Sequence, residues 1–228
     1  TAIELAKAGA SLVVNARVSK DLCDEVVEEI NALGGEAISC LADISNPEAV
    51  SFLIDQTTDS FGGVDILVNN AAVRSNIPFL EIDQEEWSRI AGTCLQGTLN
   101  LTRECIPLMI ERGGGAIVSL AGLSSYKGSV GRSHVMATKD GLMGLTRGIA
   151  IEFGEKNIRA NAAVVGRFDT VRSGNSLQTG FTTEPDIPLG RMGVPQDMAD
   201  VIRFLVGPGS AYITGQTIHI NGGAYCPH

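Results

Sequence analysis

Six short apolar runs alternate along the chain with longer segments in which apolar residues recur at helical spacing. The runs cover residues 11–14, 37–41, 65–69, 116–121, 158–164 and 217–220. Several of them are apolar at consecutive positions, which is typical of parallel strands that helices cover on both faces. We therefore expect an α/β fold with a doubly wound parallel sheet.

The segments between the runs carry the start and stop signals of helices. A pair of glycines, Gly34 and Gly35, ends the first long helical pattern. The next pattern opens with Asn46 and Pro47, a cap residue followed by a first-turn proline. Since no linker or short repeat interrupts the alternation, we expect one domain over residues 1–228.

Composition narrows the function classes. The chain has 17 basic and 26 acidic residues and a net charge of −9, so we expect no nucleic-acid partner. We also expect no membrane span and no signal peptide, because no apolar run is long enough for the first and no pattern indicates the second. The cysteines are odd in number and scattered, without a metal-binding spacing, which favours a cytoplasmic protein with no metal site. They are Cys23, Cys40, Cys94, Cys105 and Cys226.

Five segments then carry a resemblance to a known family. They are LVNNAA (67–72), ATKDGLMGLTRGIAIEFG (137–154), IRANAAVVG (158–166), PLGRMGVPQDMAD (188–200) and YITGQTIHINGG (212–223). On these the chain is identified as a member of the short-chain dehydrogenase/reductase family, and it is most similar to the ketoacyl-reductase type. The resemblance implies a Rossmann-like sheet and hydride transfer between NAD(P) and a carbonyl or alcohol substrate. It also implies a homo-oligomer, dimer or tetramer.

The family's catalytic positions are mostly replaced in this chain. The resemblance implies a tyrosine four residues before a lysine, and these positions hold Val135 and Lys139. The family's serine lies thirteen residues before the tyrosine, which is Gly122 here. The asparagine that anchors a proton-relay water corresponds to Cys94. Of these four groups, only Lys139 matches the family.

Three hypotheses follow from the replaced positions. Ordinary carbonyl reduction is lost, because a missing acid costs about 10²–10⁴ in rate and groups that act as a unit fail together. Alternatively the pocket runs altered chemistry, or the chain is a structural partner subunit of a hetero-oligomer. Replacement groups near the site are His134, Tyr126, Ser124 and Ser125, although His134 should point about 100° away from its neighbour Val135.

The cofactor site is also implied by the resemblance. Asn70 and Ala71 correspond to the segment along the dinucleotide, Asp43 to the residue that meets adenine, and Lys139 to the ribose ligand. Arg17 suits a ribose 2′-phosphate, so NADP(H) is favoured over NAD(H), with a plain surface charge as the alternative interpretation of Arg17.

The N-terminal segment departs from the family. Residues 1–9 resemble the helix after the family's first strand and Gly-rich turn, and neither feature is in the sequence. That strand is central in the family's sheet, so its omission would leave buried backbone groups unpaired at about 1–3 kcal/mol each. We therefore expect a trimmed sequence that lacks the pyrophosphate cradle, which weakens the expectation of cofactor binding. The alternative is a genuine start with Thr1 and Glu4 as a capping box.

Two further segments carry expectations. Residues 171–187 are rich in Ser, Thr and Gly, and a long loop of this kind is often a lid over a site. The helix expected from about Gln84 to Ile110 has more apolar surface than one face can bury. In the family this helix and residues 134–153 form a dimer interface. The apolar residues are Trp87, Ile90, Leu95, Leu99 and Leu101.

Overall fold

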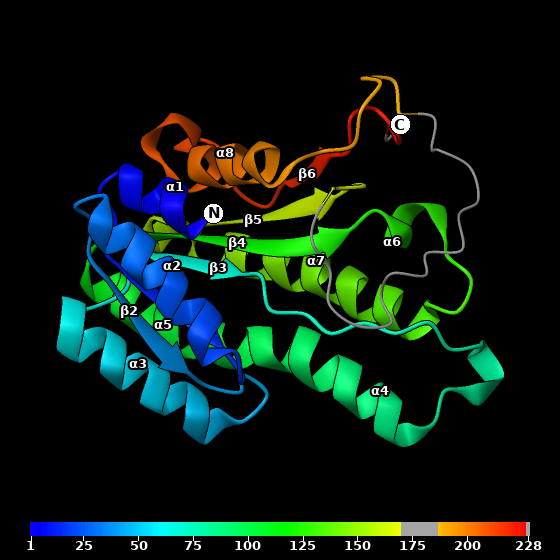
Figure 1. Ribbon diagram of the computed structural model, residues 1–228, viewed down its shortest axis with the longest axis horizontal. Helices are drawn as coiled ribbons and strands as arrows, with labels where there is room; N and C mark the ends of the chain where they lie inside the picture. The colour runs from blue at the N-terminus through cyan, green and yellow to red at the C-terminus, as the bar shows by residue number, and fades with distance from the viewer. Residues whose placement is uncertain (170–186, 227–228) are drawn as a thin grey trace.

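The computed structural model describes residues 1–169 and 187–226 and shows parallel strands between layers of helices (Figure 1). Every hydrogen-bonded pair of the named strands is parallel. The predicted α/β fold is confirmed, and all six predicted strands are present. They are β1 (Leu12–Ala16), β2 (Ala37–Leu41), β3 (Ile66–Asn69), β4 (Gly115–Gly122), β5 (Ile158–Val165) and β6 (Thr217–Ile220).

Helices cover both faces of the strands. Helix α8 packs on β4 from one side, and α7 packs on the same strand from the other side, as Figure 1 shows. Helix α1 contacts α2 and α8, whereas α3 contacts α5 and α4 contacts α7. The helices are α1 (Ala2–Lys7), α2 (Lys20–Ala32), α3 (Pro47–Phe61), α4 (Gln84–Ala91), α5 (Gly97–Glu111), α6 (Ser124–Lys127), α7 (Ser133–Phe153) and α8 (Pro195–Val206).

The strands form two sheets, not the single sheet that the sequence predicts. Strands β1 and β2 pair with each other, and the remaining strands pair in the order β3-β4-β5-β6. Neighbouring strands belong to one sheet only where backbone hydrogen bonds join them. No described strand pairs with both β1 and β3, so the two sets of strands stay separate. Helix packing therefore holds the two sheets together.

The predicted helix boundaries have clear local causes. The Asn46 side chain accepts hydrogen bonds from the backbone N–H groups of Glu48 and Ala49, so it caps α3. Helix α2 ends just before Gly34, whose φ of 80° lies in the left-handed region. Both predicted boundaries are confirmed. The side chain of Thr1 makes no capping bond to α1.

The long helix predicted from Gln84 to Ile110 is interrupted. A π-helical turn, Gly92–Gln96, separates α4 from α5. Such turns contain one residue more than the regular helix and are frequent at functional sites. The predicted helical segment is confirmed, since the backbone stays helical through the turn, but the turn itself was not predicted, because intrahelical spacing alone does not register an inserted residue.

The core lies on both sides of the central strands. Met109, Ile117 and Ile158 are fully or almost fully buried between α5, α7 and the sheet. On the opposite face, Ile202 and Leu205 of α8 are equally buried. These two layers fix the carboxyl ends of β4 and β5, where the cavity described below opens.

Within residues 1–169 and 187–226, no helix is long and apolar enough to cross a membrane. The same residues contain no group of His, Cys, Asp and Glu side chains that could hold a metal ion. The segment predicted to be a lid, 171–187, lies almost entirely outside the described residues.

Candidate active site

A cavity of about 980 Å³ opens at the carboxyl ends of several strands. Four of its lining residues are Ala16 at the end of β1, Asn70 after β3, Gly122 on β4 and Val165 on β5. Ligands of parallel α/β sheets bind beyond this edge of the strands, and the volume is typical of ligand pockets. The cavity is therefore the candidate site.

Val135 and Lys139 line the same wall of the cavity, one turn apart on α7. Val135 is buried at 7% exposure. The Nζ of Lys139 donates a hydrogen bond of 2.6 Å to the carbonyl oxygen of Leu120. Burial lowers the pKa of Lys139, and the nearby charge of Arg74 acts in the same direction. The wall thus contains a partly buried amine and no hydroxyl at position 135.

Gly122 faces the cavity from β4 and has a hydroxyl group beside it. A Cβ atom placed on Gly122 would lie 3.7 Å from the Oγ of Ser124. Ser124 also lines the cavity, so its hydroxyl lies next to the space that a serine side chain at position 122 would enter. The hydroxyl of Ser125 is buried and makes no hydrogen bond within the described residues. Ser124 is therefore the better placed of the two serines.

Cys94 lies in the π-helical turn and is fully buried. Its Sγ lies 3.4 Å from the backbone oxygen of Val73. The described residues that line the cavity include its neighbour Thr93 and not Cys94 itself. This thiol therefore contacts the back of the cavity wall and does not reach a ligand directly.

His134 belongs to a hydrogen-bond cluster behind the wall. Its Nε2 lies 2.8 Å from the Oγ of Ser75. Because the Ser75 hydroxyl donates to the carboxylate of Glu86, the imidazole must donate to Ser75 through Nε2. Hydrogen bonds from Arg89 are the main reason that the pKa of Glu86 falls to about 2. As expected from helical geometry, His134 faces α4 rather than the cavity.

Tyr126 is also directed away from the cavity. Its hydroxyl lies 3.1 Å from the Sδ of Met143. Its ring packs edge-on against His219, with centroids 4.5 Å apart, and contacts Tyr225 at 5.2 Å. Tyr126 therefore packs in an aromatic cluster and does not occupy the tyrosine's place.

The far end of the cavity holds the residues expected to bind adenosine. Arg17 and Asp43 both line it, with Nη1 and Oδ2 3.9 Å apart. Hydrogen bonds from the side chain and backbone of Ser45 lower the pKa of Asp43. Asn70 and Ala71 line the cavity as well. The polar groups at this end and Lys139 at the other fit the two ends of a nicotinamide dinucleotide.

Comparisons with known proteins agree with this architecture. A family model described as enoyl-(acyl carrier protein) reductase matches residues 1–225. The 3-oxoacyl-[acyl-carrier-protein] reductase FabG of Staphylococcus epidermidis is 35% identical over 226 residues, which cover 98% of this chain and 92% of the relative. The chain belongs to the short-chain dehydrogenase/reductase family.

Two further members of the short-chain dehydrogenase/reductase family extend the comparison. The 3-oxoacyl-[acyl-carrier-protein] reductase of a Synechocystis species is 36% identical over 227 residues, covering 98% of this chain and 90% of its own. The crystal structure of a 3-ketoacyl-ACP reductase from Sinorhizobium meliloti superposes with a TM-score of 0.90 at 29% identity, covering 98% and 92% of the two chains. The predicted family and Rossmann-like fold are confirmed.

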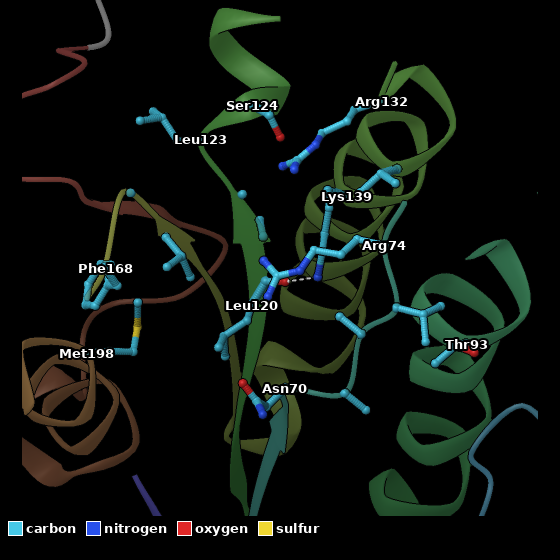
Figure 2. Close-up of a pocket in the computed structure, with 18 of the residues that line it drawn as sticks. Asn70, Arg74, Thr93, Leu120, Leu123, Ser124, Arg132, Lys139, Phe168 and Met198 are labelled. Atoms are coloured by element: carbon cyan, nitrogen blue, oxygen red, sulfur yellow. Dashed lines mark hydrogen bonds between the residues drawn. The ribbon is translucent and has the colours of Figure 1, made fainter. Parts of the chain in front are cut away.

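Several cationic residues of this short-chain dehydrogenase/reductase pocket were not predicted from the sequence. Arg74 and Arg132 line the cavity, and Figure 2 shows both side chains directed into it, with Lys139 nearby. Arg132 is the residue immediately before α7, and its backbone is not helical, so the one-turn spacing that relates Val135 to Lys139 does not extend to it. Arg74 follows β3 by a few residues, where polar groups of parallel sheets converge.

Proposed function

We propose that the chain is an NADP(H)-binding member of the short-chain dehydrogenase/reductase family that has lost the family's ordinary carbonyl reduction. The observation that carries the proposal is Val135, which faces the cavity one turn before Lys139. The described lining residues include no tyrosine and no histidine. Loss of a proton donor costs about 10²–10⁴ in rate, and the other groups of such a unit cannot compensate.

The cofactor would be held by residues at both ends of the cavity. In this proposal Arg17 binds the ribose 2′-phosphate, Asp43 meets the adenine, and Asn70 and Ala71 lie along the dinucleotide. Lys139 binds the ribose next to the nicotinamide. When bound, the nicotinamide supplies or accepts a hydride. The preference for NADP(H) rests on the guanidinium group of Arg17, which suits a phosphate better than a hydroxyl.

Thermal unfolding with each cofactor tests the binding part of the proposal. NADPH at about 100 times its Kd should add about 2.7 kcal/mol of stability, and NADH at the same concentration should add less. Arg17→Ala should remove the difference between the two cofactors. Arg103→Ala, an exposed site on α5, is the matched control and should keep it. Equal stabilisation by NADH and NADPH would contradict the proposed preference.

A ketone-reduction assay tests the catalytic part. We expect NADPH oxidation with simple ketones to stay near background. The proposed loss of activity would be overturned if the unmodified protein reduced ketones robustly, and if this activity were lost in Lys139→Ala but unchanged by substitutions of Val135.

A second candidate function is altered chemistry in the same pocket, and the position of Ser124 favours it. The Ser124 hydroxyl lies beside the place of the family's serine, and the amine of Lys139 has a lowered pKa. In this hypothesis Ser124 orients a substrate oxygen and Lys139 donates the proton. Ser124→Ala and Lys139→Met would then each abolish an activity that Val135→Ala leaves intact.

A further inference from the structure

The cavity collects positive charge in a protein that is acidic as a whole. The chain has a net charge of −9, yet the described lining residues include one carboxylate and six cations. The carboxylate, Asp43, lies at the adenosine end beside Arg17. The cations are Arg17, Arg74, Lys127, Arg132, Lys139 and Arg167. Apart from Arg17, they come from the segments after β3 and β5 and from the region of α6 and α7.

Three of these cations converge around one part of the cavity. In Figure 2, Arg74 and Lys139 are directed toward the carboxyl end of β4, and Arg132 points toward Ser124. Burial is the main reason that the pKa of Lys139 is lowered, and the charge of Arg74 acts in the same direction. Arg132 is oriented by its Nε, which donates a hydrogen bond of 2.7 Å to the amide oxygen of Asn76. Lys139 is likewise oriented by its hydrogen bond to the carbonyl oxygen of Leu120, and the three cations come from separate segments of the chain.

The surrounding wall is apolar, which strengthens the electrostatic interaction. Val135, Leu123, Phe168 and Met198 line the same cavity. Arginine stays protonated under all ordinary conditions, so cations in such a setting repel one another and disfavour the charged lysine. An anion placed among them relieves this repulsion and accepts charge-assisted hydrogen bonds. The guanidinium plane matches the two oxygens of a carboxylate in particular.

We propose that this part of the cavity binds the carboxylate of a small oxo or hydroxy acid through Arg74 and Arg132. Ser124 is then the hydrogen-bond donor nearest to the acid's carbonyl or hydroxyl oxygen. The inference rests on the proposed function, since it names the ligand class of the same pocket. It does not depend on whether hydride transfer has been lost.

Calorimetric titration of the whole protein in the presence of NADPH tests the inference. The ligands are pyruvate, 2-oxobutanoate and 4-oxopentanoate, each compared with its methyl ester. At least one acid should bind, and its neutral ester should bind at least about 10-fold more weakly, the usual effect of a charge-assisted hydrogen bond. Equal binding of acid and ester, or no binding of any acid, would overturn the inference without any variant.

Two variants and a control locate the subsite. Arg74→Gln and Arg132→Gln should each weaken binding of the acid about 10- to 100-fold. Arg103→Gln removes the same charge from an exposed position on α5 and should leave binding unchanged. Equal weakening in all three variants would show a nonspecific charge effect and reject the subsite. Inorganic phosphate that binds these arginines more tightly than any acid would reject a carboxylate as the ligand.

The same titrations separate the two proposals. NADPH is titrated first, without any acid, and its binding should survive in Arg74→Gln and Arg132→Gln. If NADPH binds and the acids do not, the anion subsite is wrong while the cofactor proposal stands. If the acids bind and NADPH does not, the cofactor proposal is wrong while the subsite stands.

Discussion

The amine of Lys139 on α7 donates a hydrogen bond of 2.6 Å to the backbone oxygen of Leu120 on β4. Position 135, one turn earlier, offers only a valine side chain, and the amine takes a backbone partner across the cavity wall instead. The bond holds the first turns of α7 against the carboxyl end of the strand. The family's lysine is therefore fixed in place although its usual neighbours are replaced.

We expect Lys139→Met to remove a pH-dependent part of the stability. Burial lowers the pKa of Lys139 from its ordinary value of 10.5, so the protonated amine opposes folding at neutral pH. This opposition disappears as the pH rises from the lowered pKa toward 10.5. The unfolding free energy of the unmodified protein, relative to Lys139→Met, should therefore rise through the alkaline range in urea titrations. Lys127→Met, which removes an exposed lysine from α6, is the matched control.

Restoring ordinary catalysis should require several changes together. We expect Val135→Tyr alone to leave ketone reduction near background, because the tyrosine, serine and relay group act as a unit. Val135→Tyr combined with Gly122→Ser and Cys94→Asn should gain measurable NADPH oxidation. If new chemistry already uses Lys139, these changes will instead gain nothing and abolish the existing activity. Steady-state assays of the single and triple variants distinguish the outcomes.

Two of the restoring changes, Gly122→Ser and Cys94→Asn, should differ in their effect on stability. A side chain at Gly122 meets Ser124 at an ordinary van der Waals distance, so Gly122→Ser should be tolerated. Cys94 is fully buried, and Cys94→Asn adds a larger polar group to a filled site. We expect a loss of about 1–3 kcal/mol for this change alone. Urea unfolding of each single variant measures the difference, and a stable Cys94→Asn protein would contradict the packing argument.

Glu86 should stabilise the fold at neutral pH and not in acid. Hydrogen bonds, mainly from Arg89, lower its pKa from 4.5 to about 2, so the contribution is complete above pH 4.5 and is lost as the pH falls toward 2. At pH 7, Glu86→Gln should cost about 2 kcal/mol, less than the full linkage value because the carboxylate retains some contact with water. Urea unfolding from neutral to acidic pH should show the cost shrinking. Glu85→Gln, an exposed position on the same helix, is the matched control and should cost less than Glu86→Gln at pH 7.

Self-association remains a prediction. The exposed apolar residues of α4 and α7 indicate which surface would form the interface. Ile90 is fully buried in the chain's own core, whereas Trp87 on α4 is 43% exposed and Ile151 on α7 is 86% exposed. We expect a homo-oligomer by light scattering at micromolar concentration, and Ile151→Asp should weaken it. Leu22→Asp, exposed on α2 on the other side of the sheet, should not. A monomeric unmodified protein would favour the alternative of a partner subunit in a hetero-oligomer.

The strands and helix boundaries could be predicted because their causes are local. Consecutive apolar residues indicate a strand buried on both faces, and Asn46 followed by Pro47 indicates the start of α3. The sequence predicted that a strand pairing with both β1 and β3 is absent, but it did not predict that the remaining strands form two separate sheets. How the chain divides its strands between sheets depends on pairing at a distance, which a local pattern does not contain.

The candidate site was predictable in part. The one-turn spacing correctly placed Val135 and Lys139 on one wall of the cavity. The position of Ser124 beside Gly122 could not be foreseen, because counting along the chain does not describe how the chain turns after β4. Arg74 was missed for a similar reason, since its approach to Lys139 depends on the path of the segment after β3.

The π-helical turn Gly92–Gln96 makes this part of the pocket sensitive to the number of residues rather than to their identity. One residue turns a helix by about 100°, so an inserted residue rotates everything before it relative to everything after it. Deletion of one residue in the turn would restore a regular helix and turn Thr93 away from the cavity, even if every remaining side chain were kept. Substitutions there should be accepted more readily than any change of length.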